Sequence, residues 1–502
     1  MKIIKYMVIT GIILMSGLLG GCDSWLDVKP ATEVNEDDMF NTEQGFMDAL
    51  YGIYVNMAKN DLYGGTLQTT LDMTGQLLSF YDKDACPYAY FSVFDYENVK
   101  CTSISDALWK RLYYCVGLAN NIIKFLDKPE AVQICASYNY LRGEALALRA
   151  YLHFELVRMY APDVKAKPEY LSIPYRKTFS PLIEPQLTVA KVYENIIADL
   201  EEAKTLLAED VIRTDMPDWI GNSVKAEDTD NVTDKNNVHY VSNFLKSRKY
   251  RMNYYAVLGT LARVYITRGT ANDLEKAYEY ATEVINSGKF RPIQEKDIIV
   301  GGDETKNRDI LFTDEFIFGL YSPSIDAYYK SNFDESYGKS KIIIYGLSDI
   351  YGYGSRDLRQ TYWYKTNWGV SFLMKHNSDL NYAKEKVRMI TLPEMYYIAA
   401  EAHPAEAADL LEEILPSREV HTTLSSRSER EEVLQELLKE YRKEYFGDGQ
   451  FFYAYKRMIG EGRVVNALQL DIPNHDKVLV WPLPQDEIKY GDRVSEIWQT
   501  EK

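Results

Sequence analysis

The sequence predicts a mainly helical fold, in which pairs of antiparallel helices are interrupted by long irregular segments with a few short strands. Over several stretches apolar residues recur at steps of three and four, as on one face of a helix. The clearest of these stretches follow one another in pairs. Two segments, 60–103 and 290–385, lose this period and are rich in aromatic residues.

Helices are expected where the helical period continues between recognisable start and stop residues. Asn41-Thr42 and Thr188 are suitable N-caps. Pro162 ends the clearest helix, whose two apolar faces predict that it is packed between neighbouring helices. The expected helices cover 43–58, 104–126, 140–160, 189–207, 391–402, 405–415 and 429–445.

The segment 251–288 predicts two antiparallel helices. Arg268-Gly269 separates them, and Gly288 is a suitable C-cap for the second. Alanines lie where the two helices would cross, so their axes can approach closely. This helix pair resembles a tetratricopeptide repeat.

The irregular segments are too long for ordinary loops in a compact domain, which indicates that they carry function. In the second segment, 316–318 and 341–345 are predicted to be β-like. Near the C-terminus, 478–488 is expected to form a short strand or an extended run held by prolines.

The first thirty residues have the pattern of an export signal. An apolar run, too short to be a confident membrane span, leads through Gly20-Gly21 directly into Cys22. A cysteine at this place resembles a bacterial lipoprotein signal, which implies cleavage of 1–21 and acylation of Cys22, for example with palmitate. Residues 22–42 would then form a tether, and 43–502 a single domain. The alternative is an ordinary secretory signal with an incidental cysteine.

The composition constrains the partners. A net charge of −17 argues against nucleic acid. The 41 tyrosines, beside only 18 phenylalanines, offer apolar faces with a polar rim, which suit sugars and extended peptides. Packing in the core or at a subunit interface is the alternative explanation for most of these rings.

The cysteines after Cys22 leave two interpretations open. They are Cys86, Cys101, Cys115 and Cys135, and an exported protein could join them in two disulfides or leave them free. None has the CxxC spacing of a metal site, and no cofactor is predicted.

The sequence does not predict an enzyme. The six histidines lie far apart, and no HExxH, GxSxG or Walker pattern is present. With 74 acidic residues, a catalytic carboxylate pair could always be chosen, so their number is no evidence for glycoside hydrolysis. We expect His153 to be structural, and Glu440, Arg442 and Glu444 to form a structural ion network.

Seven blocks of the sequence, in the right order, resemble the SusD/RagB outer-membrane nutrient-binding lipoproteins of Bacteroidetes. Each block alone is weak, but chance agreement of all seven in order is not expected. The blocks are Cys22-Asp23-Ser24-Trp25-Leu26-Asp27-Val28-Lys29-Pro30; Arg142–Tyr160; Thr188–Leu207; Arg251–Gly288; Arg388–Ala402; Glu440-Tyr441-Arg442-Lys443-Glu444 with Gly447-Asp448-Gly449-Gln450 and Lys456-Arg457; and Trp481-Pro482-Leu483-Pro484 with Glu487-Ile488.

The resemblance implies a SusD-like α-α superhelix of tetratricopeptide-like helix pairs, with a ligand surface built from the irregular segments. It also implies a lipid anchor on the outer face of the outer membrane. There the protein would capture oligosaccharides and deliver them to a SusC/RagA-like TonB-dependent β-barrel transporter. Two alternatives remain: a RagB-like protein that binds peptides, and a scaffold that binds a partner protein but no nutrient.

Candidate ligand-binding residues follow from the chemistry of stacking, which needs exposed aromatic faces with polar groups beside them. For each candidate, packing in the core is the alternative role. The candidates are Tyr81, Asp82, Tyr88 and Tyr90 in the first irregular segment, and Tyr353, Trp363 and Trp368 in the second.

Overall fold

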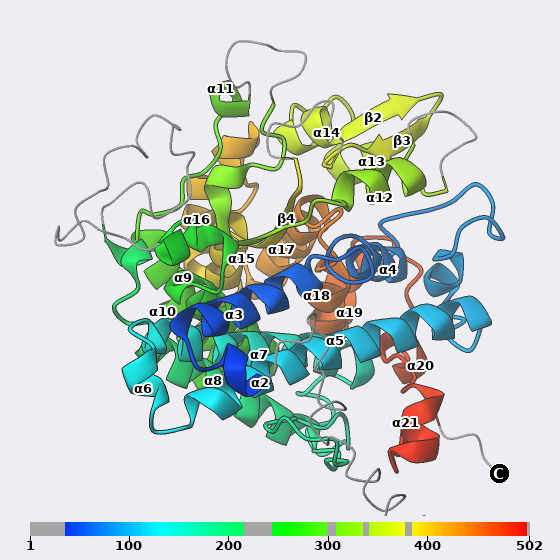
Figure 1. Cartoon of the computed structure of the whole chain (residues 1–502). Coiled ribbons are helices and arrows are strands. Elements are labelled where there is room, and N and C mark those ends of the chain that lie inside the picture. The colour runs from blue at the N-terminus through cyan, green and yellow to red at the C-terminus, as the bar shows by residue number, and fades with distance from the viewer. Residues whose placement is uncertain (1–35, 215–242, 299–307, 335–340, 377–383, 499–502) are drawn as a thin grey trace, which may run out of the picture.

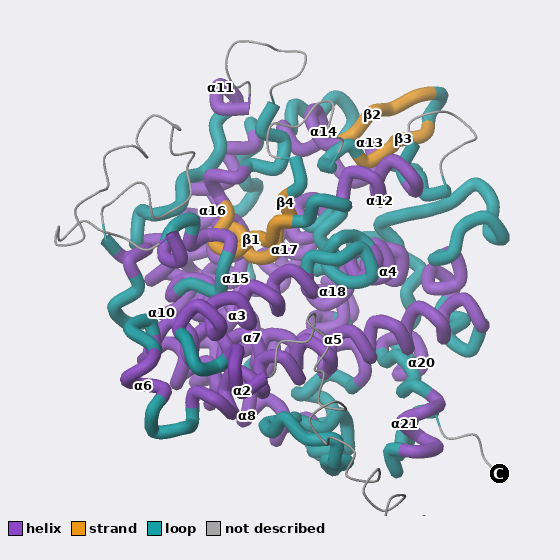
Figure 2. Tube along the Cα trace, viewed as in Figure 1, coloured by secondary structure: helices purple, strands orange, loops and turns teal. Residues whose placement is uncertain are grey.

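The computed structural model describes residues 36–214, 243–298, 308–334, 341–376 and 384–498, and within them the fold is mainly helical (Figures 1 and 2). Cys22 and the predicted cleavage site lie outside the described residues. The range expected as a tether includes one short described helix, α2 (Glu36–Met39).

The described part of the chain consists mostly of α-helices, with a few short strands in its second half. The α-helices after α2 are α3 (Glu43–Met57), α4 (Thr66–Thr74), α5 (Val99–Leu126), α6 (Ala131–Ile134), α7 (Tyr138–Tyr160), α8 (Val189–Leu206), α9 (Tyr254–Arg268), α10 (Ala271–Asn286), α11 (Glu295–Ile298), α12 (Ile325–Asn332), α13 (Leu347–Tyr351), α14 (Leu358–Trp363), α15 (Leu392–Ala402), α16 (Ala407–Ile414), α17 (Arg430–Glu444), α18 (Phe451–Met458), α19 (Gly462–Asn466), α20 (Asp476–Leu479) and α21 (Gln485–Tyr490). The strands are β1 (Phe316–Tyr321), β2 (Tyr364–Asn367), β3 (Val370–Leu373) and β4 (Lys386–Thr391).

The long helices pack against one another, and the two helices expected in 251–288 are neighbours. Helix α7 packs between α5 and α8, α9 packs on α10, and α15 packs on both α10 and α16. Every residue of α7 from Gly143 to Tyr160 is buried, which confirms the prediction of a helix enclosed by others. None of the described helices is long and apolar enough to cross a membrane.

The predicted caps are present. Thr42 Oγ1 accepts a hydrogen bond from the N–H of Gly45 over 3.1 Å at the start of α3. Thr188 Oγ1 accepts one from the N–H of Lys191 over 3.3 Å at the start of α8. Gly269 ends α9 with a left-handed φ of 67°, where glycine carries no steric penalty.

The first irregular segment contains a helix that the apolar period does not reveal, so the prediction of a segment without helix is wrong there. Helix α4 is buried from Leu67 to Thr74, polar residues included, so it has no exposed face and no amphipathic stripe. Its polar side chains find partners inside the protein. Thr70 Oγ1 donates to the carbonyl of Thr66 over 2.6 Å, and Asp72 Oδ2 accepts from the N–H of Gly447 over 2.6 Å.

The second irregular segment holds short helices as well as strands. Strand β1 pairs antiparallel with β4, and β2 pairs antiparallel with β3. The predicted β-like run at 316–318 is part of β1, whereas 341–345 contributes isolated bridges. Helices α12, α13 and α14 were not predicted. The run 478–488 has no strand; it includes the end of α20 and most of α21, joined by an extended stretch.

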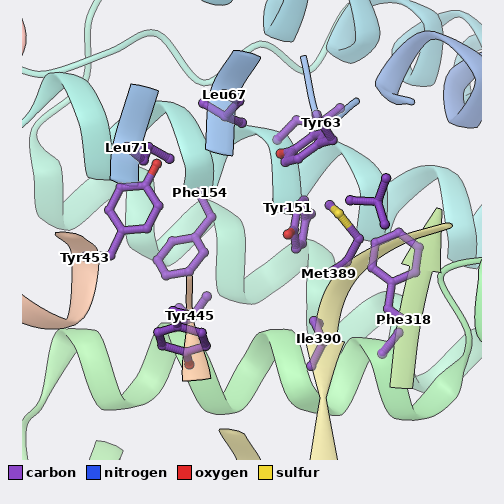
Figure 3. Close-up of a cluster of buried hydrophobic side chains, with 14 of the residues drawn as sticks. Tyr63, Leu67, Leu71, Tyr151, Phe154, Phe318, Met389, Ile390, Tyr445 and Tyr453 are labelled. Carbon is purple, nitrogen blue, oxygen red and sulfur yellow. The ribbon is translucent and has the colours of Figure 1, made fainter. Parts of the chain in front are cut away.

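The core lies where the first irregular segment, the helix pairs and the β1–β4 ribbon meet (Figure 3). There Leu67 and Leu71 of α4 face Tyr151 and Phe154 of α7. Phe318, Ile390 and Tyr453 approach from β1, β4 and α18. The irregular segments are therefore part of one core with the helices, which gives a ligand surface on them a rigid base.

Candidate ligand-binding surface

Backbone pairing joins the two irregular segments. Ser79 and Ile343 exchange N–H···O bonds of 2.7 and 2.9 Å, and Ile344 and Ser371 exchange bonds of 2.8 and 2.9 Å. Residue 79, residues 343–344, β3 and β2 therefore lie in a row. We call this row, with the loop to residue 354, the aromatic platform (residues 79–82, 341–354 and 364–373).

The platform has a small apolar core of its own. Ile343, Val370, Phe372 and Met374 are buried together, and Tyr81 packs against them while half-buried. A predicted residue of the first segment thus lies against the hairpin that carries Trp368. In Figure 1 β2, β3, α13 and α14 lie together at one end of the molecule.

Trp368 occupies the tip of the β2–β3 hairpin. Asn367 pairs with Val370, so the turn consists of Trp368 and Gly369, which have φ values of 54° and 79°. A two-residue hairpin turn of this kind requires positive φ at both positions and favours Asn-Gly. The left-handed backbone conformation costs about 1–2 kcal/mol for a tryptophan. The side chain is 90% exposed, so burial of the ring does not offset this cost. Strain at an exposed apolar side chain points to a role outside folding.

Tyr353 is presented in a similar way. It is fully exposed, and it lies between Gly352 and Gly354, whose φ values are 88° and 73°. A Cβ at either glycine would meet no atom within 4 Å, so backbone conformation rather than space favours glycine there. Two large exposed aromatic side chains are thus held on turns with defined geometry.

Buried ion pairs fasten α14, which directly precedes strand β2 of the platform, to the helices of the body. Arg359 on α14 lies 2.7 Å from Asp357, 2.8 Å from Glu440 and 3.1 Å from Glu444. Arg388 on β4 lies 2.6 Å from Glu444, which also pairs with Arg418. Burial alone would raise the pKa of Glu444, but the guanidinium groups of Arg418, Arg388 and Arg359 hold it well below its usual range.

This network bears out the predicted structural role of Glu440 and Glu444. The third residue of that prediction, Arg442, points elsewhere and donates to the carbonyl of Leu468 over 3.3 Å. His153 is also structural, as predicted: its ring stacks on Tyr175 at a centroid distance of 4.0 Å.

The seven predicted ligand residues fall into two groups. Asp82, Tyr353 and Trp368 are exposed, and Tyr81 and Tyr90 are half-buried. Tyr90 already has the Lys83 ammonium 4.4 Å from its ring centroid. Asp82 Oδ1 accepts a hydrogen bond from the N–H of Asp84 over 2.8 Å, which leaves its other oxygen at the surface.

Two of the seven predicted ligand residues are packed in the core instead. Tyr88 is buried, and its hydroxyl accepts from that of Tyr328 over 2.8 Å. Trp363 is wholly buried, with Nε1 donating to the carbonyl of Ile310 over 2.7 Å and the Lys375 ammonium 3.6 Å from its ring centroid. Neither ring reaches the surface in this structure.

Sequence reasoning missed Tyr345. This side chain is half exposed and follows Ile344, which pairs with Ser371 of β3, so it belongs to the platform. It ends the run 341–345 that was predicted to be β-like, and its aromatic character was the available signal.

The four described cysteines are free thiols, and each is buried. Burial raises the pKa of Cys101 and Cys115 to about 12 and that of Cys135 to about 11, so these thiols stay protonated at neutral pH. Among the described residues no group of three or more His, Cys, Asp or Glu side chains could hold a metal ion.

Comparison with known proteins finds similarity to one family. Residues 24–217, less than half of the chain, match the family model of SusD-like proteins described as "Starch-binding associating with outer membrane". SusD-like protein P2 of Formosa agariphila is 25% identical over 282 residues, which are 56% of this chain and 46% of that relative. The match thus spans about half the length of that relative.

Solved structures share the fold. A SusD superfamily protein of Bacteroides thetaiotaomicron has a TM-score of 0.65 and 21% identity, over 90% of this chain and 98% of that one. A SusD-like carbohydrate binding protein of Bacteroides vulgatus has a TM-score of 0.61 and 19% identity, over 83% of each chain.

Proposed function

We propose that this SusD-like chain is a surface lipoprotein that captures oligosaccharides on the aromatic platform and delivers them to a SusC/RagA-like TonB-dependent β-barrel. The observation that carries the proposal is Trp368, which is 90% exposed at the tip of the β2–β3 hairpin. A flat ring face held away from the protein body suits stacking on a pyranose ring. Tyr353 provides a second such face.

The polar groups near these rings suit sugar hydroxyls. Asp82 is exposed beside Tyr81, which packs against the hairpin core. On this account Trp368 and Tyr353 stack on sugar rings, and Asp82 accepts hydrogen bonds from their hydroxyls. Tyr81 and Tyr345 supply the partly exposed edges of the same surface, and Tyr90, which lies outside the platform, is a further candidate contact.

The comparisons favour sugars as the cargo over peptides. The family model is described as starch-binding, and the relative of Bacteroides vulgatus is named a carbohydrate binding protein. The words "associating with outer membrane" support the proposed location. Anchoring through Cys22 and partnership with a barrel are the finer parts of the proposal, and they rest on the sequence resemblance.

The cargo is tested with soluble protein that begins after Cys22. Affinity electrophoresis against a panel of polysaccharides and calorimetry with oligosaccharides should show binding to one glycan class. Casein-type peptides form the second arm. Binding only to peptides would replace the carbohydrate cargo by a peptide cargo, and binding to neither would contradict capture by this chain alone.

The anchor is tested separately in cells. Cys22→Ala should shift the protein from the membrane fraction to the soluble fraction and abolish incorporation of labelled palmitate. An unchanged membrane fraction without label would contradict the lipid anchor. A barrel that co-purifies with the wild-type chain would support the proposed delivery.

A further inference from the structure

A cavity lies away from the aromatic platform. It has a volume of about 340 Å³ and opens where the end of α6, the first turn of α7 and the end of α8 meet. Figure 1 places α6 and α8 at the end of the molecule opposite to β2 and β3. This volume lies within the range of about 300–1,000 Å³ that is typical of small-molecule sites.

Hydrogen bonds fix the aromatic walls of this cavity. Tyr138 donates from its hydroxyl to the carbonyl of Leu126 over 3.3 Å. The Tyr140 hydroxyl donates to the carbonyl of Glu209 over 3.2 Å and accepts from the N–H of Val211 over 3.1 Å. Both rings are half-buried and line the cavity. Because the hydroxyls are already bonded, both rings are held in a preset geometry. The Arg248 guanidinium lies 5.1 Å from the Tyr140 ring centroid, so Tyr138 is the ring whose face we assign to a ligand.

The charged side chain of the lining is a carboxylate. Among the described residues, no lysine, arginine or histidine lines the cavity, so it offers no cationic side chain to an anion. Glu209 lines it, is exposed, and forms no ion pair with another described residue. Asn139 lines it as well, and its side chain makes no hydrogen bond to another described residue.

We propose that this cavity binds a small polar molecule that carries a primary ammonium group. The Glu209 carboxylate would pair with the ammonium, Asn139 Oδ1 would accept a second hydrogen bond, and a tyrosine face would supply a cation–π contact. The apolar remainder of the ligand would rest on Val132 and Leu206, which also line the cavity. An amino sugar and the amino terminus of a short peptide share this chemistry.

The proposed ammonium site is independent of glycan capture, since the cavity shares no residue with the platform. Loss of platform binding in Trp368→Ala should leave it intact. The two proposals therefore fail separately in experiment.

Calorimetry and ligand-observed NMR with four probes test the proposal. Glucosamine and leucinamide carry the ammonium, and N-acetylglucosamine and N-acetyl-leucinamide are their neutral counterparts. We expect at least one ammonium probe to bind, and its neutral counterpart to bind at least tenfold more weakly. Binding of glucosamine alone would identify an amino sugar as the source, and binding of leucinamide alone a peptide terminus.

Three variants make the assignment specific to the cavity. Glu209→Gln keeps the shape of the side chain and should weaken ammonium binding about tenfold or more. Ala136→Trp, at an exposed lining residue, should fill the space and abolish binding without changing the thermal midpoint. Gln133→Ala changes an exposed neighbour outside the lining and should bind as the wild type does.

The proposal is overturned by any of three results. The first is that neither ammonium probe binds at millimolar concentration. The second is that each neutral counterpart binds as tightly as its ammonium probe. The third is that Glu209→Gln and Ala136→Trp fold normally and bind the probes as the wild type does. Circular dichroism of each variant confirms the fold.

Discussion

Arg359 on α14 donates from Nη2 to Oε2 of Glu440 on α17 over 2.8 Å, with both side chains buried. This bond crosses from the segment that carries Tyr353 and Trp368 to a helix of the main body. Glu444, one turn further along α17, bonds the other terminal nitrogen of the same guanidinium over 3.1 Å. The platform is thus fixed to the body by charged groups that water does not reach.

Removing the guanidinium should be costly. Arg359→Met leaves the buried Asp357 without its cation and leaves Glu440 with Lys443 alone. The loss of one partner from a buried ion pair costs about 3–5 kcal/mol. Urea unfolding followed by circular dichroism measures the change in the free energy of unfolding. The matched control is Arg430→Met, which breaks an exposed pair with Glu461 and should cost less than about 1 kcal/mol. Equal effects of the two variants would contradict a structural role for the buried network.

His153 should make stability depend on pH. Its Nδ1–H donates to the carbonyl of Arg149 over 2.8 Å, and Nε2 accepts from the N–H of Arg176 over 3.0 Å, so the ring is held neutral. Burial lowers its pKa to about 3 from 6.5. Between these values the unfolded chain binds more protons, so this group's contribution to stability falls as the pH falls from 6.5 toward 3.

The expected slope for His153 is about 1.4 kcal/mol per pH unit. Urea unfolding of the wild type and of His153→Gln at pH 7 and pH 5 measures it. The variant should be less stable at pH 7 but should lose less stability on acidification. The same loss in both proteins would show that His153 is not the group that titrates.

Trp368→Asn should separate binding from stability. Asn-Gly is the favoured pair for this hairpin turn, so the variant should keep or raise the free energy of unfolding by up to about 1 kcal/mol. Glycan binding should be lost, because the exposed ring is gone. Calorimetry and urea unfolding on the same samples provide both readouts. Retained binding would remove Trp368 from the site.

The glycines beside Tyr353 should matter through their backbone conformation. Gly352→Ala places a Cβ at a φ of 88°, which costs about 1–2 kcal/mol locally although the space is open. The loop should respond by changing conformation, which moves Tyr353 and weakens glycan binding. Gly460→Ala is the control, since its φ is not in the left-handed region and a Cβ there also meets no atom. Glycan affinity unchanged from wild type in Gly352→Ala would show that the position of Tyr353 does not contribute to binding.

The thiols should not react with reagents in the folded protein. The four described cysteines are free and buried, so a thiol reagent should react with them only after unfolding. A reducing agent should leave the thermal midpoint unchanged. A drop in the midpoint on reduction, or fewer than four reactive thiols in denaturant, would indicate a disulfide.

The sequence predicted the elements that have an amphipathic face or a clear cap. Thr42 and Thr188 cap α3 and α8 as expected, and α7 has the buried surroundings that its two apolar stripes indicate. Helix α4 escaped prediction for a physical reason. It is buried on all sides, and its polar residues bond to partners far along the chain, such as Gly447. Apolar and polar residues therefore do not alternate with the helical period.

The candidate surface was predictable as a region but not residue by residue. Composition identifies aromatic-rich segments, yet it cannot distinguish Trp363, which is buried under Lys375, from Trp368, five positions later and exposed. That distinction depends on the hairpin turn and on the pairing of Ile344 with Ser371. Both are tertiary features with weak local signals.

Capture of glycans on the aromatic platform is tested by comparing the wild type with the double variant Trp368→Ala/Tyr353→Ala. Affinity electrophoresis against the polysaccharide that the wild type retains gives the binding readout, and thermal unfolding reports on the fold. We expect full loss of retardation with an unchanged thermal midpoint, since both side chains are exposed. Retardation equal to that of the wild type would contradict this expectation and would locate the sugar site outside the aromatic platform.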